Sequence, residues 1–234
     1  MSVNSLVFEL VGPAGVGKTA VLRAIAGLAP LVRTGVRIER LRQLPALAWS
    51  MIALTPAMVE ILFADPRSFG SAMRHLGRLR ALPIDVVRAR ASGHEAILLD
   101  EGPVFSLGRL SVFHQADQGS GALARTWRTE VDRWSTLLNG IVLLDARNEV
   151  LAERIRRRPK AHQVKAGSDR EVFEFLDRYR VAYRDIASRL TAGGRVQMVE
   201  FDTTTTPIEQ VATDTLAALS NWGARSPAPA YRGI

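Results

Sequence analysis

The stretch Ser5–Thr19, SLVFELVGPAGVGKT, decides the fold of this chain. It opens with an apolar run typical of a strand and closes with Gly12–Thr19, GPAGVGKT, which matches the pattern G-x-x-x-x-G-K-[ST]. Good helix formers follow over Thr19–Ala29. A loop of this pattern between a strand and a helix directs backbone N–H groups toward phosphate oxygens at a helix N-terminus. We expect a nucleotide-binding loop, and the alternative is a glycine-rich turn that holds no ligand.

The residues of this loop have separate expected roles. The ammonium group of Lys18 would neutralise the β- and γ-phosphates, and the hydroxyl of Thr19 would ligate Mg²⁺. ATP and Mg²⁺ are therefore the expected cofactors. The residues expected to contact the nucleotide here are Gly12, Pro13, Ala14, Gly15, Val16, Gly17, Lys18, Thr19 and Ala20.

The composition is ordinary for a globular protein, with 47% apolar and 23% charged residues among 234. Because the chain has no cysteine, disulfides, thiolate metal sites and cysteine catalysis are excluded. The four histidines are scattered and show no metal-ligand spacing. The net charge of +8 is compatible with nucleic-acid binding, but no recognition-helix or RNA-binding signature accompanies it, so we expect no nucleic-acid partner.

Two segments bear on membranes and targeting. The N-terminal residues MSVNSLVFEL lack a charged region and enter the first strand directly, so we expect no signal peptide and a cytoplasmic protein. Residues 45–63, PALAWSMIALTPAMVEILF, have nearly the length of a membrane span, but Pro56 and Glu60 interrupt them. A buried helix or helix pair is the favoured interpretation. An apolar flap that meets a lipid-linked acceptor stays open.

Apolar runs and helical periodicity alternate along the chain. Strands are expected at residues 6–11, 31–38, 96–100, 140–145 and 195–202. Helices are expected at residues 19–29, 40–63, 68–92 with an interruption at Pro83 left open, 107–118, 122–138, 148–158, 169–190 and 207–219. This alternation predicts a three-layer α/β fold with a mainly parallel five-stranded sheet and helices on both faces. We expect one domain over residues 1–222 and a disordered tail over residues 223–234.

An acidic pair, Asp100–Glu101, ends the third expected strand, at the edge of the sheet where such folds bind ligands. Asp100 is placed to hold Mg²⁺, directly or through water. Glu101 could polarise a water molecule, as in an ATPase, or accept a proton from a substrate hydroxyl, as in a kinase. The alternative for Glu101 is a solvated loop acid or an ion-pair partner of a nearby arginine.

Basic residues crowd residues 151–183, where Arg154 and Arg158 end one expected helix and Arg170 begins the next. A mobile basic loop between helices can close over the γ-phosphate, exclude water and stabilise the charge of a transition state. A solvated basic face is the common alternative. With a phosphate-binding loop upstream we favour a lid over about residues 154–171. The expected catalytic residues are then Lys18, Glu101, Arg154, Arg158 and Arg170.

The second half of the chain carries a series of motifs. A strand ending in Asp145 precedes LAERIRRR, and then come DRE, a phenylalanine and RVAYRDIA, at residues 151–158, 169–171, 175 and 180–187. On these motifs and the glycine-rich loop the chain resembles the thymidylate-kinase-like group of P-loop nucleoside and nucleotide kinases. The resemblance implies a P-loop NTPase fold with a helical lid and an acceptor-side helical region over about residues 40–95. It also places the loop Thr203–Thr206 against adenine, so Thr204 is an expected nucleotide contact.

Departures from that group bear on the substrate. Thymidylate kinases end the third strand in Asp-Arg, with the arginine facing the acceptor's phosphate, whereas this chain has Glu101 there. A carboxylate at that place would repel a monophosphate. Pro13 and Ala14 also stand where the group tends to carry an acid. We therefore expect a hydroxyl acceptor rather than thymidylate, with Glu101 as its base and Arg67 and Arg109 as further acceptor contacts.

These features lead to a first hypothesis and two alternatives. The first is a kinase that moves the γ-phosphate of ATP to a small-molecule acceptor. The second is an ATPase or GTPase that acts as a regulatory switch, since an Asp-Glu pair can also activate water. Against this second hypothesis, the chain lacks the N/T-K-x-D motif that reads guanine, and it has no room for the helical lid domain of ring-forming ATPases. The third is a nucleotide-binding module without turnover, and a homodimer is compatible with each of them.

Overall fold

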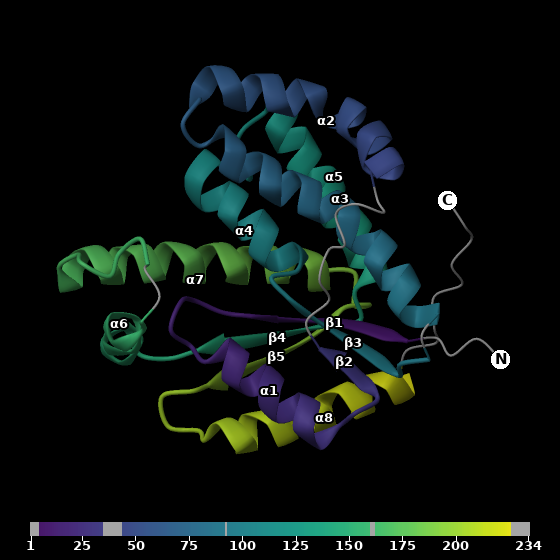
Figure 1. Ribbon diagram of the computed structural model, residues 1–234, viewed down its shortest axis with the longest axis vertical. Helices are drawn as coiled ribbons and strands as arrows, with labels where there is room; N and C mark the ends of the chain where they lie inside the picture. The colour runs from purple at the N-terminus through teal and green to yellow at the C-terminus, as the bar shows by residue number, and fades with distance from the viewer. Residues whose placement is uncertain (1–4, 35–43, 92, 160–161, 226–234) are drawn as a thin grey trace.

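The computed structural model describes residues 5–34, 44–91, 93–159 and 162–225. The strands are β1 (Leu6–Val11), β2 (Val32–Thr34), β3 (Ala96–Asp100), β4 (Gly140–Asp145) and β5 (Gln197–Asp202). The helices are α1 (Lys18–Leu28), α2 (Leu44–Ala64), α3 (Phe69–Ala91), α4 (Pro103–His114), α5 (Ala122–Leu137), α6 (Asn148–Arg157), α7 (Asp169–Thr191) and α8 (Ile208–Arg225). Strands and helices follow one another as the sequence predicts (Figure 1).

The five strands form one parallel sheet in the order β2-β3-β1-β4-β5. β1, β3 and β4 are buried along almost their whole length, whereas burial alternates along β5 at the edge. Continuous apolar runs are typical of strands covered on both faces, and alternation is typical of a strand with one solvated face. The predicted α/β fold with a parallel five-stranded sheet is confirmed.

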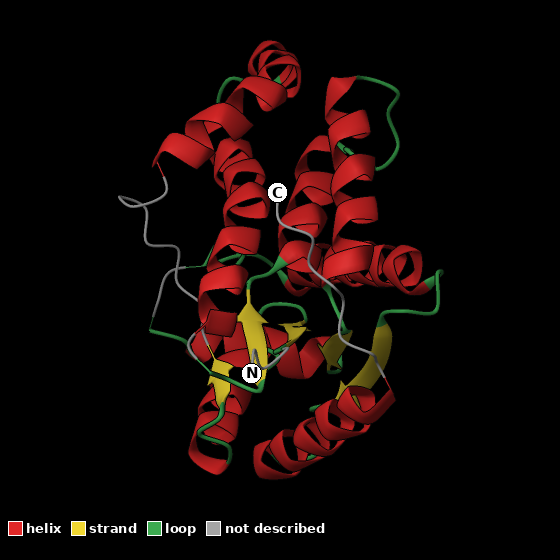
Figure 2. Cartoon of the chain, turned by 90° about the vertical axis from the view of Figure 1, so that its right-hand side faces the viewer, coloured by secondary structure: helices red, strands yellow, loops and turns green. Residues whose placement is uncertain are grey.

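Helices cover both faces of the sheet and give the molecule three layers (Figures 1 and 2). α1 and α8 pack together on one face, and α4 and α7 pack together on the other. α3 and α5 extend this second layer away from the sheet, and α2 packs on both of them at the outer end (Figure 1). β1 and β3 are neighbours, yet the helices that follow them, α1 and α4, lie on opposite faces. Sheets of this kind bind ligands at such a switch point, outside the carboxyl ends of the strands.

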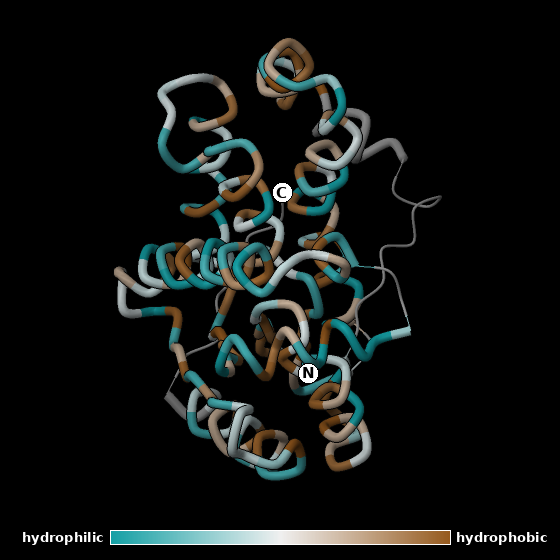
Figure 3. The backbone as a smooth tube through the Cα atoms, turned by 90° about the vertical axis from the view of Figure 1, so that its left-hand side faces the viewer, coloured by the Kyte–Doolittle hydropathy of each residue, from teal (hydrophilic) through white to brown (hydrophobic). Residues whose placement is uncertain are grey.

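The apolar segment 45–63 forms most of α2. Its inner face is buried against α3 and α5 through Leu54, Ala57 and Ile61. Its outer face keeps large apolar side chains in contact with solvent, and Phe63 is 84% exposed. The hydropathy colouring shows this apolar helix at the outermost end of the molecule (Figure 3). Among the described residues, none of the helices has the length and apolar character that a membrane crossing needs.

Two predicted boundaries, at the start of α4 and the end of α8, are wrong for identifiable reasons, and the question left open at Pro83 is answered. α4 begins at Pro103 rather than Leu107, because proline suits the first position of a helix, where its missing N–H is not needed. α3 runs through Pro83 without interruption, and Pro83 is itself buried. α8 continues past residue 219 to Arg225, into the expected tail, because the ring of Trp222 packs 5.7 Å from that of Phe8 in β1. Residues 35–38 of the second expected strand, 40–43 of the next helix, 160–161 of the lid and 226–234 of the tail lie outside the described residues.

His75 makes the stability of the fold depend on pH. It lies in α3, is 8% exposed and meets the ring of Phe105 edge-on at 5.7 Å. Burial, with the nearby arginines Arg109 and Arg74, lowers the pKa of His75 to about 4. In the unfolded chain His75 binds a proton below about pH 6.5, whereas in the folded chain it stays neutral until about pH 4. The free energy of unfolding therefore decreases as the pH falls from about 6.5 toward 4.

We expect this histidine to lower the free energy of unfolding by about 2 kcal/mol between pH 7 and pH 5. The variant His75→Gln has no such proton to bind, so its loss over the same interval should be smaller by about that amount. Urea unfolding of both proteins at the two pH values measures the difference. Equal losses in the two proteins would show that His75 is not the group responsible.

Candidate functional site

The Gly12–Thr19 loop joins β1 to α1 and packs closely on two further elements. A Cβ atom added at Gly12 would lie 2.3 Å from the carbonyl oxygen of Leu144 in β4, and one added at Gly15 would lie 2.9 Å from a carbonyl oxygen of α6. Gly15 and Gly17 have φ angles of 86° and 97°, in the left-handed region that favours glycine. Close approach and backbone conformation therefore explain why glycine occupies these positions.

The loop ends at the N-terminus of α1, where Lys18 is the first helical residue. The N–H of Ala20 donates to the carbonyl oxygen of Gly17 at 2.9 Å, but no side chain of the described residues caps this helix, so the N–H groups of Lys18 and Thr19 remain available to an anion. The Nζ atom of Lys18 donates to the carbonyl oxygens of Gly12, at 2.6 Å, and Pro13, at 3.2 Å. Burial lowers the pKa of Lys18 to about 8, while the Asp100 carboxylate nearby acts in the opposite direction. A positive group thus lies inside the curve of the loop.

A cavity of about 730 Å³ opens beside this loop at the carboxyl ends of β1 and β3. It is bounded by the loop, by the turn after β3, by α4 and α7, and by the segment that joins α6 to α7. Most of the residues predicted from the sequence line it: Gly12, Ala14, Gly15, Val16, Gly17, Lys18, Thr19, Ala20, Asp100, Glu101, Arg109, Arg154 and Arg158.

The acidic pair lies in a turn that is held from outside the cavity by an arginine of α3. Arg78 donates through Nη2 to the carbonyl oxygen of Asp100, at 2.8 Å, and through Nε to that of Glu101. Its Nη1 atom also lies 3.5 Å from the Glu101 carboxylate, and the Glu101 side chain is about half exposed. Glu101 has a φ angle of 57°, which is uncommon for a residue with a side chain. The turn therefore presents both carboxylates at the cavity in a constrained backbone.

Two arginines of the expected lid reach the cavity. Arg154 in α6 donates through Nη2 to the carbonyl oxygen of Thr203, at 2.9 Å, and through Nη1 to its hydroxyl, at 3.2 Å. The same hydroxyl donates to the carbonyl oxygen of Val16 in the glycine-rich loop, at 3.0 Å. Arg154 is thus fixed beside the loop after β5, and Arg158 lines the cavity one helical turn further on.

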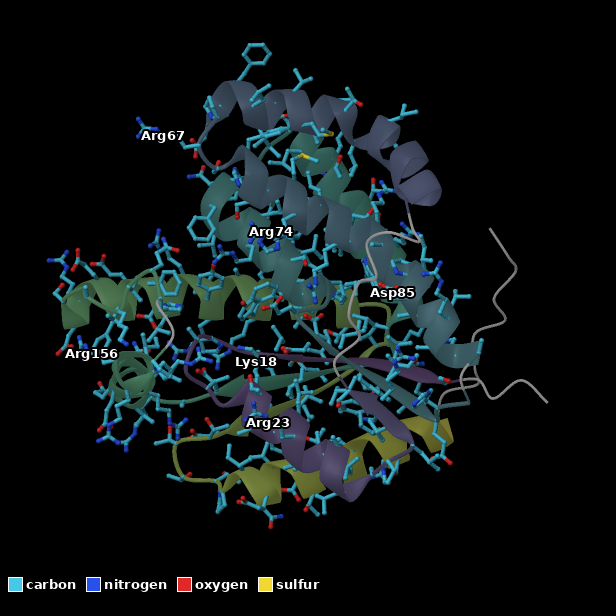
Figure 4. All side chains as sticks on the ribbon, viewed as in Figure 1. Lys18, Arg23, Arg67, Arg74, Asp85 and Arg156 are labelled. Atoms are coloured by element: carbon cyan, nitrogen blue, oxygen red, sulfur yellow. The ribbon has the colours of Figure 1, made fainter. Side chains whose placement is uncertain are left out.

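Four predicted residues do not line the cavity. Arg170 is exposed and pairs with Glu174 in its own helix, at 2.8 Å. The hydroxyl of Thr204 accepts the N–H of Arg147 at 2.9 Å, and Thr203 is the residue of this loop that lies against the glycine-rich loop. Arg67 follows α2 and points away from the body of the molecule, far from Lys18 (Figure 4). Pro13 contributes its carbonyl oxygen to Lys18 instead.

The part of the cavity wall that α7 forms is aromatic. Phe175, Tyr179 and Tyr183 come from one face of α7, with neighbouring ring centroids 4.9 Å and 5.5 Å apart. Arg109 of α4 donates to the Tyr179 hydroxyl at 2.5 Å and lies 4.5 Å from the centre of the Phe113 ring. This wall offers flat apolar surfaces and one fixed cation to whatever molecule enters.

Six lining residues were not predicted as site residues from the sequence: Arg23, Phe105, His162, Phe175, Tyr179 and Tyr183. A signal for Tyr179 exists, because aromatic residues at 175, 179 and 183 repeat with the spacing of one helix face. His162 contacts the Phe175 ring edge-on at 5.5 Å, and burial lowers its pKa. Its sequence surroundings give no such signal, because it lies in an irregular segment between two helices.

The oxygen atoms at the loop suit magnesium. The Thr19 hydroxyl and the Asp100 and Glu101 carboxylates line the same cavity. Mg²⁺ prefers oxygen ligands and is commonly held by one or two carboxylates together with phosphate groups and water. Within the described part of the chain, no group of three or more His, Cys, Asp or Glu side chains could hold a metal by itself. These residues therefore fit a magnesium ion that arrives with a nucleotide better than one held by the protein alone.

Replacing Asp100 by asparagine should raise the Mg²⁺ concentration that half-saturates nucleotide binding by at least about tenfold, since a carboxylate ligand becomes neutral. Binding of a fluorescent ATP analogue, titrated with Mg²⁺, measures this. Glu95→Gln, an exposed carboxylate just before the same strand, is the matched control and should leave the titration unchanged. An unchanged titration in the Asp100 variant would contradict a role for this carboxylate in metal binding.

No model of a known protein family matches the chain, and no curated protein sequence is significantly similar to it. The resemblance to thymidylate-kinase-like proteins therefore remains an expectation based on the motifs. Any function assigned to the cavity has to come from the chemistry of its own residues.

Proposed function

We propose that this protein is an ATP-dependent phosphotransferase that moves the γ-phosphate of ATP·Mg²⁺ to a hydroxyl group of a small acceptor. One observation carries the proposal. A single cavity is lined by a glycine-rich loop with a lysine, by an acidic pair from the neighbouring strand and by two arginines of a later helix and loop. These are the parts that phosphoryl transfer needs, namely a phosphate cradle, metal-binding oxygens, cations for the transferred group and a base.

The residues have distinct proposed roles in the reaction. The loop N–H groups and Lys18 bind the phosphates, and Thr19 and Asp100 hold the magnesium ion, whose charge offsets that of the β- and γ-phosphates. The acceptor oxygen attacks the γ-phosphorus, the bond from that phosphorus to the β–γ bridging oxygen breaks, and ADP leaves. Glu101 accepts the proton of the acceptor hydroxyl. Arg154 and Arg158 stabilise the charge of the transferred phosphoryl group.

The acceptor is proposed to be a neutral hydroxyl compound rather than a monophosphate. The Glu101 carboxylate faces the cavity from the strand end, and a phosphate dianion placed beside it would be repelled. Arg78 offsets this charge only in part, because its closest atom lies 3.5 Å from the carboxylate. The aromatic wall of α7 supports an acceptor with a flat or apolar surface.

ADP release from ATP·Mg²⁺ across a panel of acceptors tests the proposal. The panel holds nucleosides, nucleoside monophosphates, sugars, aminoglycoside-like polyols and polyprenols, with the Lys18→Ala protein as the blank. Stimulation by one hydroxyl class that is absent in the blank would support the kinase. Stimulation by monophosphates alone would overturn the acceptor proposal and leave a kinase.

A switch ATPase or GTPase is the second candidate, supported by the same acidic pair. Asp100 and Glu101 both line the cavity, and a carboxylate next to a metal-binding aspartate can orient an attacking water molecule. Steady hydrolysis that no acceptor changes would favour this second candidate. Nucleotide binding without any turnover would instead favour a binding module that regulates a partner.

A further inference from the structure

Glu9 is the one charged residue in β1, and its side chain is completely buried. Its carboxylate lies at the N-terminus of α4, where Oε2 accepts the N–H of Val104 at 2.7 Å and Oε1 accepts that of Phe105 at 2.9 Å. Pro103 begins this helix and has no N–H. Glu9 thus accepts the N–H groups of the two residues that follow Pro103 in the first turn of α4. A carboxylate is well placed there, because partial positive charge collects at a helix N-terminus.

The same carboxylate lies directly behind the acidic turn of the cavity. A Cβ atom added at Gly102 would lie 2.7 Å from the Glu9 carboxyl carbon, so the backbone after Glu101 is packed against this group. Arg78 holds the turn from another side through the carbonyl oxygens of Asp100 and Glu101. The turn is therefore fixed between a buried carboxylate in β1 and an arginine in α3.

Burial of the Glu9 carboxylate lowers the stability of the fold. Burial raises the pKa of Glu9 to about 7, against the opposing effect of the Phe105 and Val104 N–H groups and of Arg78. An apolar residue in a central strand would avoid the desolvation cost. Residues that lower stability in this way are common where a site needs a fixed geometry.

We propose that Glu9 is a positioning residue for the acidic turn, holding the backbone of residues 100–102 so that Asp100 and Glu101 face the magnesium ion and the acceptor. This inference rests on the proposed function and adds to it a group that touches neither nucleotide nor acceptor, since Glu9 does not line the cavity. It acts through α4 and Gly102, in the way that groups behind metal ligands tune the ligands.

The test compares Glu9→Gln with a matched control. The amide that replaces the carboxylate can accept from one N–H but presents its own donors to the other. Glu60 in α2 also caps a helix N-terminus, since its Oε2 accepts the N–H of Leu123 in α5 at 3.1 Å, next to Gly121; it is exposed and accepts this one N–H, whereas Glu9 is buried and accepts two. Glu60→Gln therefore perturbs a carboxylate helix cap that lies outside the cavity lining.

Binding of a fluorescent ATP analogue, measured with and without Mg²⁺, gives the readout. Glu9→Gln should leave the metal-free affinity unchanged and reduce the enhancement by Mg²⁺ about tenfold, whereas Glu60→Gln should change neither. Gly102→Ala, whose added Cβ would displace the same carboxylate, is the second variant and should repeat the result if Glu9→Gln does not fold.

The outcomes separate this inference from the proposed function. If the unmodified protein shows no Mg²⁺-dependent nucleotide binding, the proposed function fails and the role of Glu9 fails with it. If the unmodified protein binds ATP·Mg²⁺ and the folded Glu9 or Gly102 variant has the same Mg²⁺ enhancement, only the positioning role is overturned. A loss of affinity that is equal with and without Mg²⁺ would also overturn it, because it indicates a general structural effect.

Discussion

Replacing Lys18 by alanine should reduce turnover of ATP by about a thousandfold. Lys18 is the cation at the centre of the glycine-rich loop, and its Nζ atom already lies at hydrogen-bond distance from the loop carbonyls of Gly12 and Pro13. With a triphosphate bound, this group is placed to meet the β- and γ-phosphates. ADP release at saturating ATP, together with ATP binding by calorimetry, measures the loss.

The control for this prediction has to separate loss of the ammonium group from loss of side-chain volume. Lys18 ties its own loop together, so alanine removes two hydrogen bonds as well as a cation. Lys18→Met keeps the length and apolar part of the side chain and should be as inactive as Lys18→Ala, with unfolding midpoints showing that both fold. ATP binding that survives in both variants would indicate that the loop does not hold phosphate.

Much of the fold could be predicted because its signals are local. The buried strands β1, β3 and β4 are short apolar runs, and a turn or loop follows each of them before the next helix. The glycine-rich loop could be assigned to the junction of strand and helix because its motif and its neighbours agree. Asp100 and Glu101 could be placed at the ligand edge of the sheet because strand ends of a parallel sheet share that edge.

Two of the predicted site residues lie outside the cavity lining because of the direction of their side chains. Arg170 belongs to a basic cluster in the sequence, but it lies on the outer side of the first turn of α7 and pairs with Glu174. Arg67 was predicted as an acceptor contact, and the break after α2 turns it to solvent (Figure 4). A charge pattern indicates that a segment is basic, but only packing decides which of its side chains face a cavity.

Glu9 and Arg78 could not be assigned a role from the sequence at all. Glu9 contacts residues that follow it by more than ninety positions, and Arg78 contacts the acidic turn from a helix with many arginines. A lone acid inside the apolar run LVFELV was a visible anomaly. Its role depends on the N–H groups at the start of α4, which lies far along the chain, because a buried carboxylate needs specific donors to offset its burial.

Replacing Glu101 by glutamine should lower turnover with a hydroxyl acceptor by about a hundredfold to ten-thousandfold, the range for loss of a general base. Glutamine has nearly the same size but cannot accept the hydroxyl proton at neutral pH. ATP binding should be unchanged, since in the proposed mechanism the phosphates are held by the loop and the metal by Thr19 and Asp100. Single-turnover phosphoryl transfer to the best acceptor of the panel measures the chemical step apart from product release.

The charge of Glu101 also predicts a gain in the same variant, for a different acceptor. If its carboxylate excludes monophosphates, Glu101→Gln should bind a nucleoside monophosphate better than the unmodified protein does, while it transfers phosphate to a hydroxyl more slowly. Arg78→Gln is the matched control, because it releases the 3.5 Å contact with Glu101 and keeps the carboxylate. If that variant loses hydroxyl transfer as fully as Glu101→Gln, the effect comes from the shape of the turn rather than from the base. A gain for monophosphates confined to Glu101→Gln would instead assign both the proton transfer and the choice of acceptor to this one carboxylate.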